Sequence, residues 1–265
     1  MMRHITSLIA STLRGWKGSH ATARTNQPDK LLELYDMEGC PFCRPVREYL
    51  TELDLDVLIH PCPKKSTRNR EKLSALGGKK QMPYLYDPNT DTGLYEMQDI
   101  IVYLKNQYDT LPQQKKTEPN VITSTLASMT RAMSGILYRP SLPADKPLEL
   151  FSYEANVKSR IVRERLTEME ISYVLRNSGK TQIVKSEPID SNLSSNAHNQ
   201  KPSSVTPLSK RQELHQRTGK IQIPYLYDPN SDKGLFEPKD IIHYLKCTYG
   251  KTPENIRIHK EAVNG

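Results

Sequence analysis

Apolar and polar residues recur between residues 32 and 108 in a pattern that predicts alternating short strands and helices. Residues 32–35 alternate between apolar and polar positions, which is typical of a strand. Val46, Leu50 and Leu53 follow at the spacing of one helix face. The same reasoning predicts strands at 56–59, 83–86 and 94–95 and helices at 68–76 and 100–108. The order is β-α-β-α-β-β-α, in which a crossover helix joins two parallel strands and a hairpin follows.

This pattern occurs twice along the chain. Residues 32–58 align without gaps on 148–174, and residues 78–108 align on 219–249 with about two-thirds of the positions identical. The self-match indicates one structural unit that is used twice. The second copy is longer by an insertion rich in Ser, Asn and Pro, which has too few large apolar residues to bury. We therefore predict a disordered insertion at about 179–215.

A short segment rich in apolar and hydroxyl residues precedes each copy. TSLIASTLRG at 6–15 resembles TSTLASMTRA at 123–132, and we expect both to form amphipathic helices that pack on their domains. The basic, acid-free N-terminus has the composition of a targeting peptide, but its duplication favours a structural role, with organelle targeting as the alternative. The predicted organisation is a helical arm (1–30), a first domain (31–110), a linker with the repeated arm (111–146), a second domain (147–250) and a tail (251–265).

The composition is that of an ordinary globular protein without a membrane span. Of 265 residues, 36% are hydrophobic and 26% are charged, and no apolar run reaches the roughly 20 residues that cross a bilayer. The net charge of +8 is scattered, which favours a basic solvated surface, and no zinc-finger or RNA-binding motif indicates a nucleic-acid partner. A secreted disulfide scaffold would have more than four cysteines in a shorter chain. We therefore expect a reducing, cytoplasmic environment.

Two of the cysteines form a CPFC motif at the predicted start of a helix. A helix N-terminus offers unpaired N–H groups and the positive end of the helix dipole, and both favour a thiolate. We assign Cys40 as the nucleophile and Cys43, one turn further on, as the resolving thiol. Arg44 and Arg47 add positive charge nearby. Half of a zinc site and an inert packed pair are the alternatives. Cys62 is interpreted as a plain loop cysteine, with a third redox thiol as its alternative.

The motifs GCPFCRPVRE, GKKQMPYLYDPN and LYEMQDIIVYL together resemble the glutaredoxins and the N-terminal domain of glutathione S-transferases. The resemblance implies an α/β fold of two tandem thioredoxin-like domains, with glutathione as a co-substrate and no metal. By this resemblance Met82 would hold the cysteinyl part of glutathione beside a cis Pro83. The rest of the implied groove consists of Lys79, Lys80, Gln81, Glu96 and Met97. The family usually has Ser or Thr at the position of Met97, so one contact to the γ-glutamyl group is lost.

The second copy keeps the frame of the motif but not its thiols. Asn156 and Ser159 replace the two cysteines, whereas Arg160, Arg163 and Glu164 retain the charges of the following helix. Asn and Ser cannot form a disulfide. We therefore predict that the second domain keeps the fold, loses the thiol reaction and packs on the first domain. A non-catalytic groove for glutathione or a peptide is the alternative.

These features favour a glutathione-linked thiol–disulfide oxidoreductase that acts through the first domain. Its partners would be glutathione and a disulfide-containing or glutathionylated protein or small molecule. A conjugating enzyme similar to glutathione S-transferases is the first alternative. It is less favoured because residues 109–147 are too few for the helical domain that binds hydrophobic electrophiles in the transferases. A non-catalytic module that binds glutathione or a protein is the second alternative.

Overall fold

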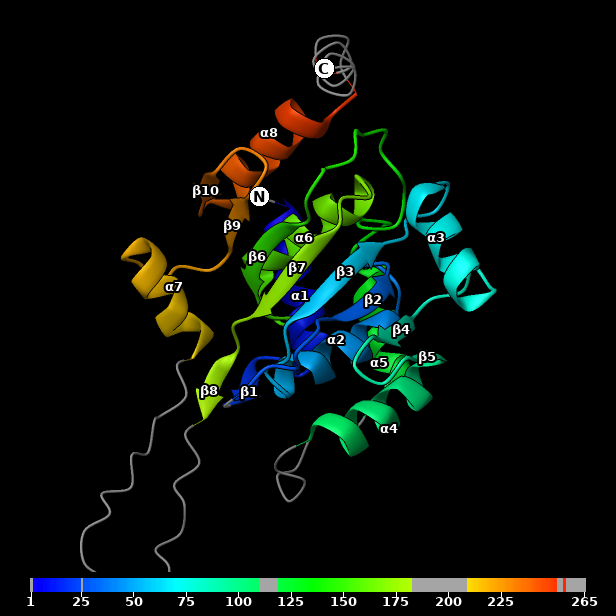
Figure 1. Cartoon of the computed structure of the whole chain (residues 1–265). Coiled ribbons are helices and arrows are strands. Elements are labelled where there is room, and N and C mark those ends of the chain that lie inside the picture. The colour runs from blue at the N-terminus through cyan, green and yellow to red at the C-terminus, as the bar shows by residue number, and fades with distance from the viewer. Residues whose placement is uncertain (1, 25, 110–118, 183–208, 252–254, 256–265) are drawn as a thin grey trace, which may run out of the picture.

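The computed structural model describes residues 2–24, 26–109, 119–182, 209–251 and 255 (Figure 1). Its helices are α1 (Met2–Leu13), α2 (Cys43–Glu52), α3 (Arg68–Gly77), α4 (Met97–Tyr108), α5 (Val121–Met129), α6 (Val157–Glu168), α7 (Lys210–Thr218) and α8 (Pro238–Tyr249). Its strands are β1 (His20–Thr22), β2 (Leu32–Asp36), β3 (Val57–Pro61), β4 (Tyr84–Asp87), β5 (Thr92–Tyr95), β6 (Leu148–Ser152), β7 (Tyr173–Asn177), β8 (Lys180–Gln182), β9 (Tyr225–Asp228) and β10 (Lys233–Leu235).

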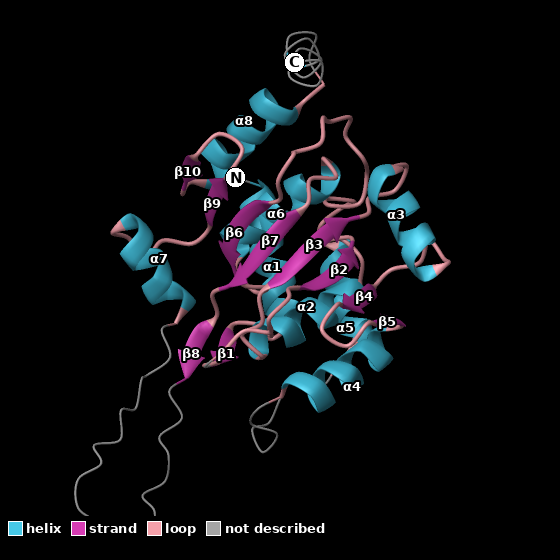
Figure 2. Cartoon of the chain, in the orientation of Figure 1, coloured by secondary structure: helices cyan, strands magenta, loops and turns pink. Residues whose placement is uncertain are grey.

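The elements predicted for the first copy are confirmed as β2, α2, β3, α3, β4, β5 and α4, with bounds that differ by a few residues. Both predicted arm helices are present as α1 and α5. Helix α3 ends with its C-cap at Gly78, whose φ of 78° is a left-handed conformation that glycine adopts without steric cost. The chain is thus an α/β protein with a mixed sheet, as Figure 2 shows.

The described strands other than β1 and β8 form one eight-stranded sheet in the order β10-β9-β6-β7-β3-β2-β4-β5. In the first half, β2 pairs parallel with β3 and antiparallel with β4, which forms a hairpin with β5. In the second half, β6 makes the corresponding pairs with β7 and β9, and β9 pairs with β10. The halves join where β3 and β7 pair antiparallel, with Leu58 opposite Val174. Figure 1 shows these two strands side by side at the centre of the sheet.

One hydrophobic core runs through both halves. The predicted helix stripe of Val46, Leu50 and Leu53 is buried, and so is the corresponding stripe of the second copy. Both stripes belong to a single cluster that includes Val57 of β3 and Leu175 of β7, which lie opposite each other across the joint. Because the core is shared, each half buries apolar surface that it could not bury alone, which matters for units of this small size.

Two features differ from the predicted organisation. β1 and β8 form a separate parallel pair, so the first arm reaches the second half of the chain. The predicted insertion at about 179–215 is shorter in the structure, because Lys180–Gln182 is β8 and α7 begins at Lys210. A capping box between Ser209 and Gln212 satisfies backbone donors at the start of α7 and explains this boundary. The rest of the insertion (183–208) and most of the tail lie outside the described residues.

Each helical arm also reaches across to the opposite half. Ser11 of α1 donates a hydrogen bond to the carbonyl oxygen of Ala155 near the start of α6 (2.9 Å). Ser124 of α5 donates to the carbonyl oxygen of Pro41 near the start of α2 (2.7 Å). The prediction that each arm packs on its own domain is therefore incomplete, because small hydroxyl side chains let each arm approach the helix start of the other half.

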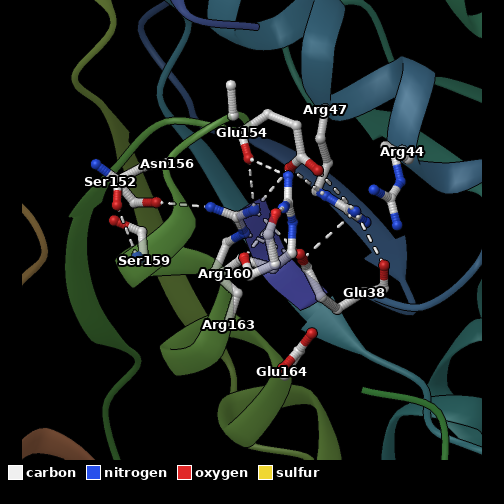
Figure 3. A network of polar contacts seen from close by, with 12 residues as sticks. Glu38, Arg44, Arg47, Ser152, Glu154, Asn156, Ser159, Arg160, Arg163 and Glu164 are labelled. Carbon is white, nitrogen blue, oxygen red and sulfur yellow. Dashed lines mark hydrogen bonds and ion pairs between the residues drawn. The ribbon is translucent and has the colours of Figure 1, made fainter. Parts of the chain in front are cut away.

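Four charged side chains pair across the joint between the halves. Arg47 Nε lies 2.9 Å from Glu154 Oε2, and Arg163 Nη2 lies 3.0 Å from Glu38 Oε1. Arg47 also lies 3.4 Å from Glu38, and Arg163 lies 3.0 Å from Glu154. None of the four side chains is more than 2% exposed. Figure 3 shows the guanidinium and carboxylate groups converging on one point, with each guanidinium in reach of both carboxylates.

The paired arginines keep this network ionised. Burial opposes ionisation of Glu154, but Arg163 and Arg47 outweigh burial and hold the pKa of Glu154 well below its usual range. Two further buried ion pairs tie the arms to α2 and α6: Arg14–Glu48 and Arg131–Glu164. A buried ion pair adds little net stability, whereas loss of one partner leaves an uncompensated charge in the interior. The network therefore penalises any other arrangement of the two halves.

Replacement of Glu154 by Gln should lower the free energy of unfolding by about 3–5 kcal/mol, because Arg163 would then have Glu38 as its remaining carboxylate and would share it with Arg47. Glu149→Gln is the matched control: its side chain is 28% exposed, and such a pair contributes about 0–1 kcal/mol. Urea denaturation at neutral pH measures both values. A loss below about 1 kcal/mol for Glu154→Gln would contradict the structural role of the network.

Candidate functional site

The CPFC motif forms the turn that leads from β2 into α2. Regular helix begins at Cys43, but the Arg44 N–H donates to the Cys40 carbonyl oxygen (3.3 Å), so Cys40 already belongs to the first helical turn. Both thiols are free, and the residues are only 7% and 0% exposed. The two cysteines therefore stand together at a helix N-terminus, where the sequence predicts them.

Hydrogen bonds favour the thiolate form of Cys40. The Cys43 thiol and the backbone N–H groups of Cys43 and Phe42 stabilise the negative charge and, against the cost of burial, lower the pKa of the Cys40 thiol to about 7. Burial and the hydrogen bond with Cys40 raise the pKa of Cys43 well above its ordinary value. The first thiol therefore ionises near neutral pH, while the second keeps its proton.

A buried carboxyl group adjoins the second thiol. Asp36, the last residue of β2, is 1% exposed and is hydrogen-bonded to the Cys43 thiol. Burial raises the pKa of Asp36, while Arg47, which donates to both of its oxygens at 2.7 and 2.8 Å, opposes that shift. The sequence analysis did not single out Asp36. The signal was present in the internal alignment, where the copy without cysteines has Ser152 at this position.

The two arginines that follow the cysteines, Arg44 and Arg47, form hydrogen bonds to side chains outside the first domain. Arg47 is held by Asp36 and Glu154, as described above. Arg44 is buried and donates to the Ser128 hydroxyl of α5 (3.1 Å). Its Nε and Nη1 atoms have no hydrogen-bond partner among the described residues, and burial lowers the pKa of its guanidinium. The causes that lower the pKa of Cys40 most are instead the hydrogen bond from the Cys43 thiol and the backbone N–H groups of Cys43 and Phe42.

The segment after α5 covers the motif. The Gly39 N–H donates to the carbonyl oxygen of Gly135 (3.2 Å), and Ile136 packs against the cluster that contains both cysteines. Gly135 has a φ of 70°, and a Cβ atom there would lie 3.0 Å from Glu38 Cβ. This approach therefore requires glycine. The sequence did not predict this cover, because the arm within the linker (111–146) was expected to pack on the second domain.

A cavity of about 380 Å³ lies between the motif and the second arm. Gly39 and Pro41, which flank Cys40, form one side, and Met129 and Met133 contribute to the other. The lining is almost entirely apolar. A space of this size is at the lower end of the range that small-molecule sites occupy, so an apolar group could bind beside the reactive thiol.

The residues expected to bind glutathione lie on two adjoining loops. The Met82–Pro83 peptide bond is cis, and Met82 packs against the cluster that contains the cysteines. Gln81 donates to Glu96 Oε1 (2.5 Å), which links the loop before β4 to the start of α4. The structure thus brings Met82, Pro83, Gln81 and Glu96 to one side of the motif.

The remaining groove candidates differ in exposure. Lys79 and Lys80 are exposed, and the Lys79 backbone N–H lies 3.2 Å from the Tyr95 hydroxyl. Met97 is only 5% exposed, and its side chain belongs to the main hydrophobic core. A contact between Met97 and a ligand would therefore have to come from its backbone, which also explains why an apolar residue is accepted at this position.

The second half has the same frame with different chemistry at the helix start. Asn156, at the position of Cys40, caps α6 by accepting a hydrogen bond from the Ser159 N–H (2.8 Å). The Ile223–Pro224 bond is cis, like its counterpart in the first half. Gln222 donates to Glu237 (2.5 Å) in the same way as Gln81 donates to Glu96. The second half therefore keeps the loop geometry and lacks the thiols.

The other two cysteines have different surroundings. Cys62 is fully buried, its thiol donates to the His60 carbonyl oxygen (3.5 Å), and burial raises its pKa, so Cys62 is not an activated thiol. Cys247 is exposed on α8, with its sulfur 3.6 Å from Nε2 of His243. Within the described ranges, no three His, Cys, Asp or Glu side chains gather to hold a metal ion.

Comparison with known families identifies the first half of the chain. The family described as glutathione S-transferase, N-terminal domain matches residues 34–115. Residues 34–115 form a glutathione S-transferase N-terminal domain. One similar solved structure is glutaredoxin 2 from Salmonella typhimurium in complex with glutathione, at 22% identity over 34% of this chain, with a TM-score of 0.27. The match spans 39% of that protein's length. No curated protein matches the sequence.

The glutathione S-transferase N-terminal domain, a glutaredoxin-like thioredoxin fold, contains nearly all of the elements from β2 to α4. It therefore carries the CPFC motif, Asp36 and both loops of the expected glutathione groove. β6, β7, β9 and β10 repeat its strand pairing in order and direction. The cover over the motif comes from outside this domain, from the segment that precedes the second half.

The rate at which Cys40 is alkylated should rise with pH and reach half of its maximum at about pH 7, because the thiolate is the reactive form. The experiment uses a small uncharged reagent and the Cys247→Ser background, which removes the exposed thiol. Cys40→Ser in that background gives the alkylation rate of the two remaining thiols, Cys43 and Cys62. A midpoint near about 8.5, the value of an ordinary cysteine, would contradict activation by the helix start.

Proposed function

We propose that this chain is a glutathione-linked thiol–disulfide oxidoreductase that acts through Cys40. The observation that supports this proposal most is the contrast between neighbouring thiols, of which Cys40 ionises near neutral pH while Cys43 stays protonated. A thiol whose pKa is close to ambient pH combines a large thiolate fraction with good nucleophilicity. A reducing compartment such as the cytoplasm would keep both thiols reduced between turnovers.

In the first step, the Cys40 thiolate attacks one sulfur of a disulfide or of a glutathionylated substrate. A new S–S bond forms to Cys40, the old S–S bond breaks, and the leaving sulfur departs with the bonding electron pair as a thiolate. The backbone N–H groups of Phe42 and Cys43 hold the attacking sulfur in place. A glutathionylated substrate would leave its glutathione on Cys40 as a mixed disulfide.

In the second step, Cys43 attacks the Cys40 sulfur and releases glutathione as a thiolate. Cys43 must lose its proton for this attack, and Asp36 is the carboxylate that is hydrogen-bonded to it. Burial raises the pKa of Asp36, which makes it a stronger base than an exposed aspartate. Two further glutathione molecules then reduce the Cys40–Cys43 disulfide and leave as glutathione disulfide.

Glutathione is proposed to bind along the loops of the glutathione S-transferase N-terminal domain. The backbone of Met82, beside the cis Pro83, would pair with its cysteinyl part. Glu96 and the backbone of Met97 would meet its γ-glutamyl end, and Lys79, Lys80 and Gln81 would line the groove. The cis bond, the exposure of the polar groups and the link between Gln81 and Glu96 support this assignment.

The second half is proposed to be a second thioredoxin-like unit without thiol chemistry. Its repeated strand pairing, its cis Ile223–Pro224 bond and the self-match of the sequence support a tandem origin. Asn156 fills the helix start with a neutral cap, so no nucleophile remains there. The role of this half is then to complete the shared core and to supply the arm that covers Cys40.

A second candidate function is conjugation of glutathione to a small apolar electrophile. The apolar cavity beside Gly39 and Pro41 favours this candidate, because it offers a binding space for an apolar substrate beside Cys40. Conjugation does not need a resolving thiol. Turnover of a model electrophile that survives Cys43→Ser would therefore support conjugation over exchange.

Cys40→Ser should abolish the glutathione-dependent reduction of a glutathionylated protein, because burial raises the pKa of the Cys43 and Cys62 thiols. Cys43→Ser should keep part of the activity, since free glutathione can resolve the mixed disulfide on Cys40. Coupling to glutathione reductase reports both rates. Cys62→Ser is the matched control and should react like the parent chain. Full reductase activity in Cys40→Ser would rule out the proposed nucleophile.

Asp36→Asn should slow the second step roughly hundredfold, because an amide cannot accept the Cys43 proton. Rapid acid quench and mass spectrometry would then detect a glutathione adduct on Cys40 that accumulates, while its formation stays fast. Asp36→Ser, which copies the second half, should behave in the same way, and circular dichroism of both variants checks that the loss of a partner of Arg47 leaves the fold in place. Asp99→Asn, at an exposed position of α4, is the control. Resolution of the adduct at the parent rate in both Asp36 variants would exclude this residue as the base.

A further inference from the structure

The two arm helices carry most of the large apolar side chains that are exposed in the described part of the chain. On α1 these include Met2, Ile5 and Ile9, and on α5 they include Ile122, Leu126 and Met129. These six residues, 43–79% exposed, are called the arm face below. When exposed apolar side chains gather on one surface of a folded protein, that surface marks an interaction site.

The arm face is continuous because the two helices lie side by side in opposite directions. Arg14, just after α1, donates to the Asn120 carbonyl oxygen at the start of α5 (2.7 Å). Arg131, just after α5, donates to the Arg3 carbonyl oxygen near the start of α1 (2.7 Å). Both helices turn their small residues inward, and Figure 2 shows both behind the sheet on the side of α2 and α6. The large apolar residues therefore point outward together.

The two segments that carry the arm face contain no acidic residue. Residues 1–28 and 119–144, which contain both arm helices, have no Asp or Glu. Arg3 lies on α1, and Lys158 is exposed next to Val157, whose carbonyl oxygen accepts from Ser7 of α1. Trp16 is 45% exposed just beyond α1. Helices with one apolar face, basic neighbours and a flanking Trp have the composition of segments that lie in a membrane interface.

We propose that the arm face docks on an anionic phospholipid surface. Its apolar side chains would enter the boundary between headgroups and acyl chains, and the basic neighbours would meet the lipid phosphates. The described helices include none that is long and apolar enough to cross a bilayer, so the contact is a surface contact. The net charge of +8 adds long-range attraction to the same surface.

A second copy of the chain is the less favoured occupant. A symmetric dimer through the arm face would oppose two acid-free segments, so Arg3 and Lys158 would find no carboxylate of the partner's arms to pair with. An anionic lipid supplies the missing negative charge. Of the six arm-face residues, Met129 also lines the cavity beside Pro41. The variants below leave Met129 and both thiols unchanged, so they test the proposal separately from the thiol chemistry.

The test is co-sedimentation of the full chain with large unilamellar vesicles. One set contains phosphatidylcholine alone, and the other contains an equimolar mixture of phosphatidylcholine and phosphatidylglycerol. The chain should sediment with the anionic vesicles at least tenfold more strongly than with the neutral ones, and added salt should reduce the difference. Equal binding to both sets, or binding to neither, would overturn the proposal.

Paired variants connect the binding to the arm face. Ile5→Gln/Ile122→Gln should weaken binding to anionic vesicles roughly tenfold or more, because two apolar side chains no longer enter the interface. Val102→Gln/Ile221→Gln removes two apolar side chains that are each 54% exposed elsewhere, and it should bind like the parent chain. Arg3→Glu/Lys158→Glu should weaken binding to anionic vesicles only.

Two outcomes would assign the arm face differently. If both apolar double variants bind vesicles like the parent chain, the membrane contact lies elsewhere and the proposal fails. If the parent chain is a dimer in sedimentation velocity without vesicles, and Ile5→Gln/Ile122→Gln is a monomer, the arm face belongs to a second copy. Circular dichroism of each variant confirms that the fold is retained, so that a loss of binding is not a loss of structure.

Discussion

The arrangement of the whole chain depends on two arginines that are buried where the halves meet. Arg47 and Arg163 each reach Glu38 and Glu154, so each carboxylate is shared by guanidinium groups from both halves (Figure 3). In an interior of low polarity, a relative shift of the halves would separate these charges without water to replace their partners. The β3–β7 pairing and the shared core can form in only one geometry that also satisfies all four groups.

The same network of charges also contacts Cys43 of the CPFC motif through Asp36. Arg47 binds Asp36 with the same guanidinium that binds Glu154, and Asp36 in turn contacts Cys43. The joint between the halves therefore positions the carboxyl group that would accept the proton of the resolving thiol. In the second half, the corresponding arginine, Arg163, donates to Ser152 (2.9 Å), which stands at the position of Asp36. That half has no cysteine at its helix start. The arginine frame occurs twice because it builds the joint, whereas the thiols, on which the proposed reaction depends, occur in one half only.

Local patterns could predict the elements but not how the halves meet. Periodicity located β2, α2, β3, α3, β4, β5 and α4, because each places its apolar residues on one side. The β3–β7 pairing depends on which strand edges meet, and local periodicity carries no information on that. In α2, the residues from Cys43 to Thr51 are all buried, charges included. A sequence pattern assigns Arg47 to solvent, and only the opposing carboxylates of Asp36, Glu38 and Glu154 explain its burial. Asp36 escaped notice for the same reason, since its role depends on two partners distant in the fold.

The two helix starts show why the thiols could be replaced without loss of the frame. A helix start needs a group that accepts hydrogen bonds from its first backbone N–H groups. In α2 the Cys40 thiolate accepts from the N–H groups of Phe42 and Cys43, and in α6 the Asn156 amide accepts from the Ser159 N–H. Both solve the same local problem, but only the Cys40 thiol has its pKa lowered by that stabilisation. The hydrogen bond from the Cys43 thiol contributes most to the lowered pKa, and the backbone N–H groups at the helix start add to it, so the second thiol and the helix start act on Cys40 together.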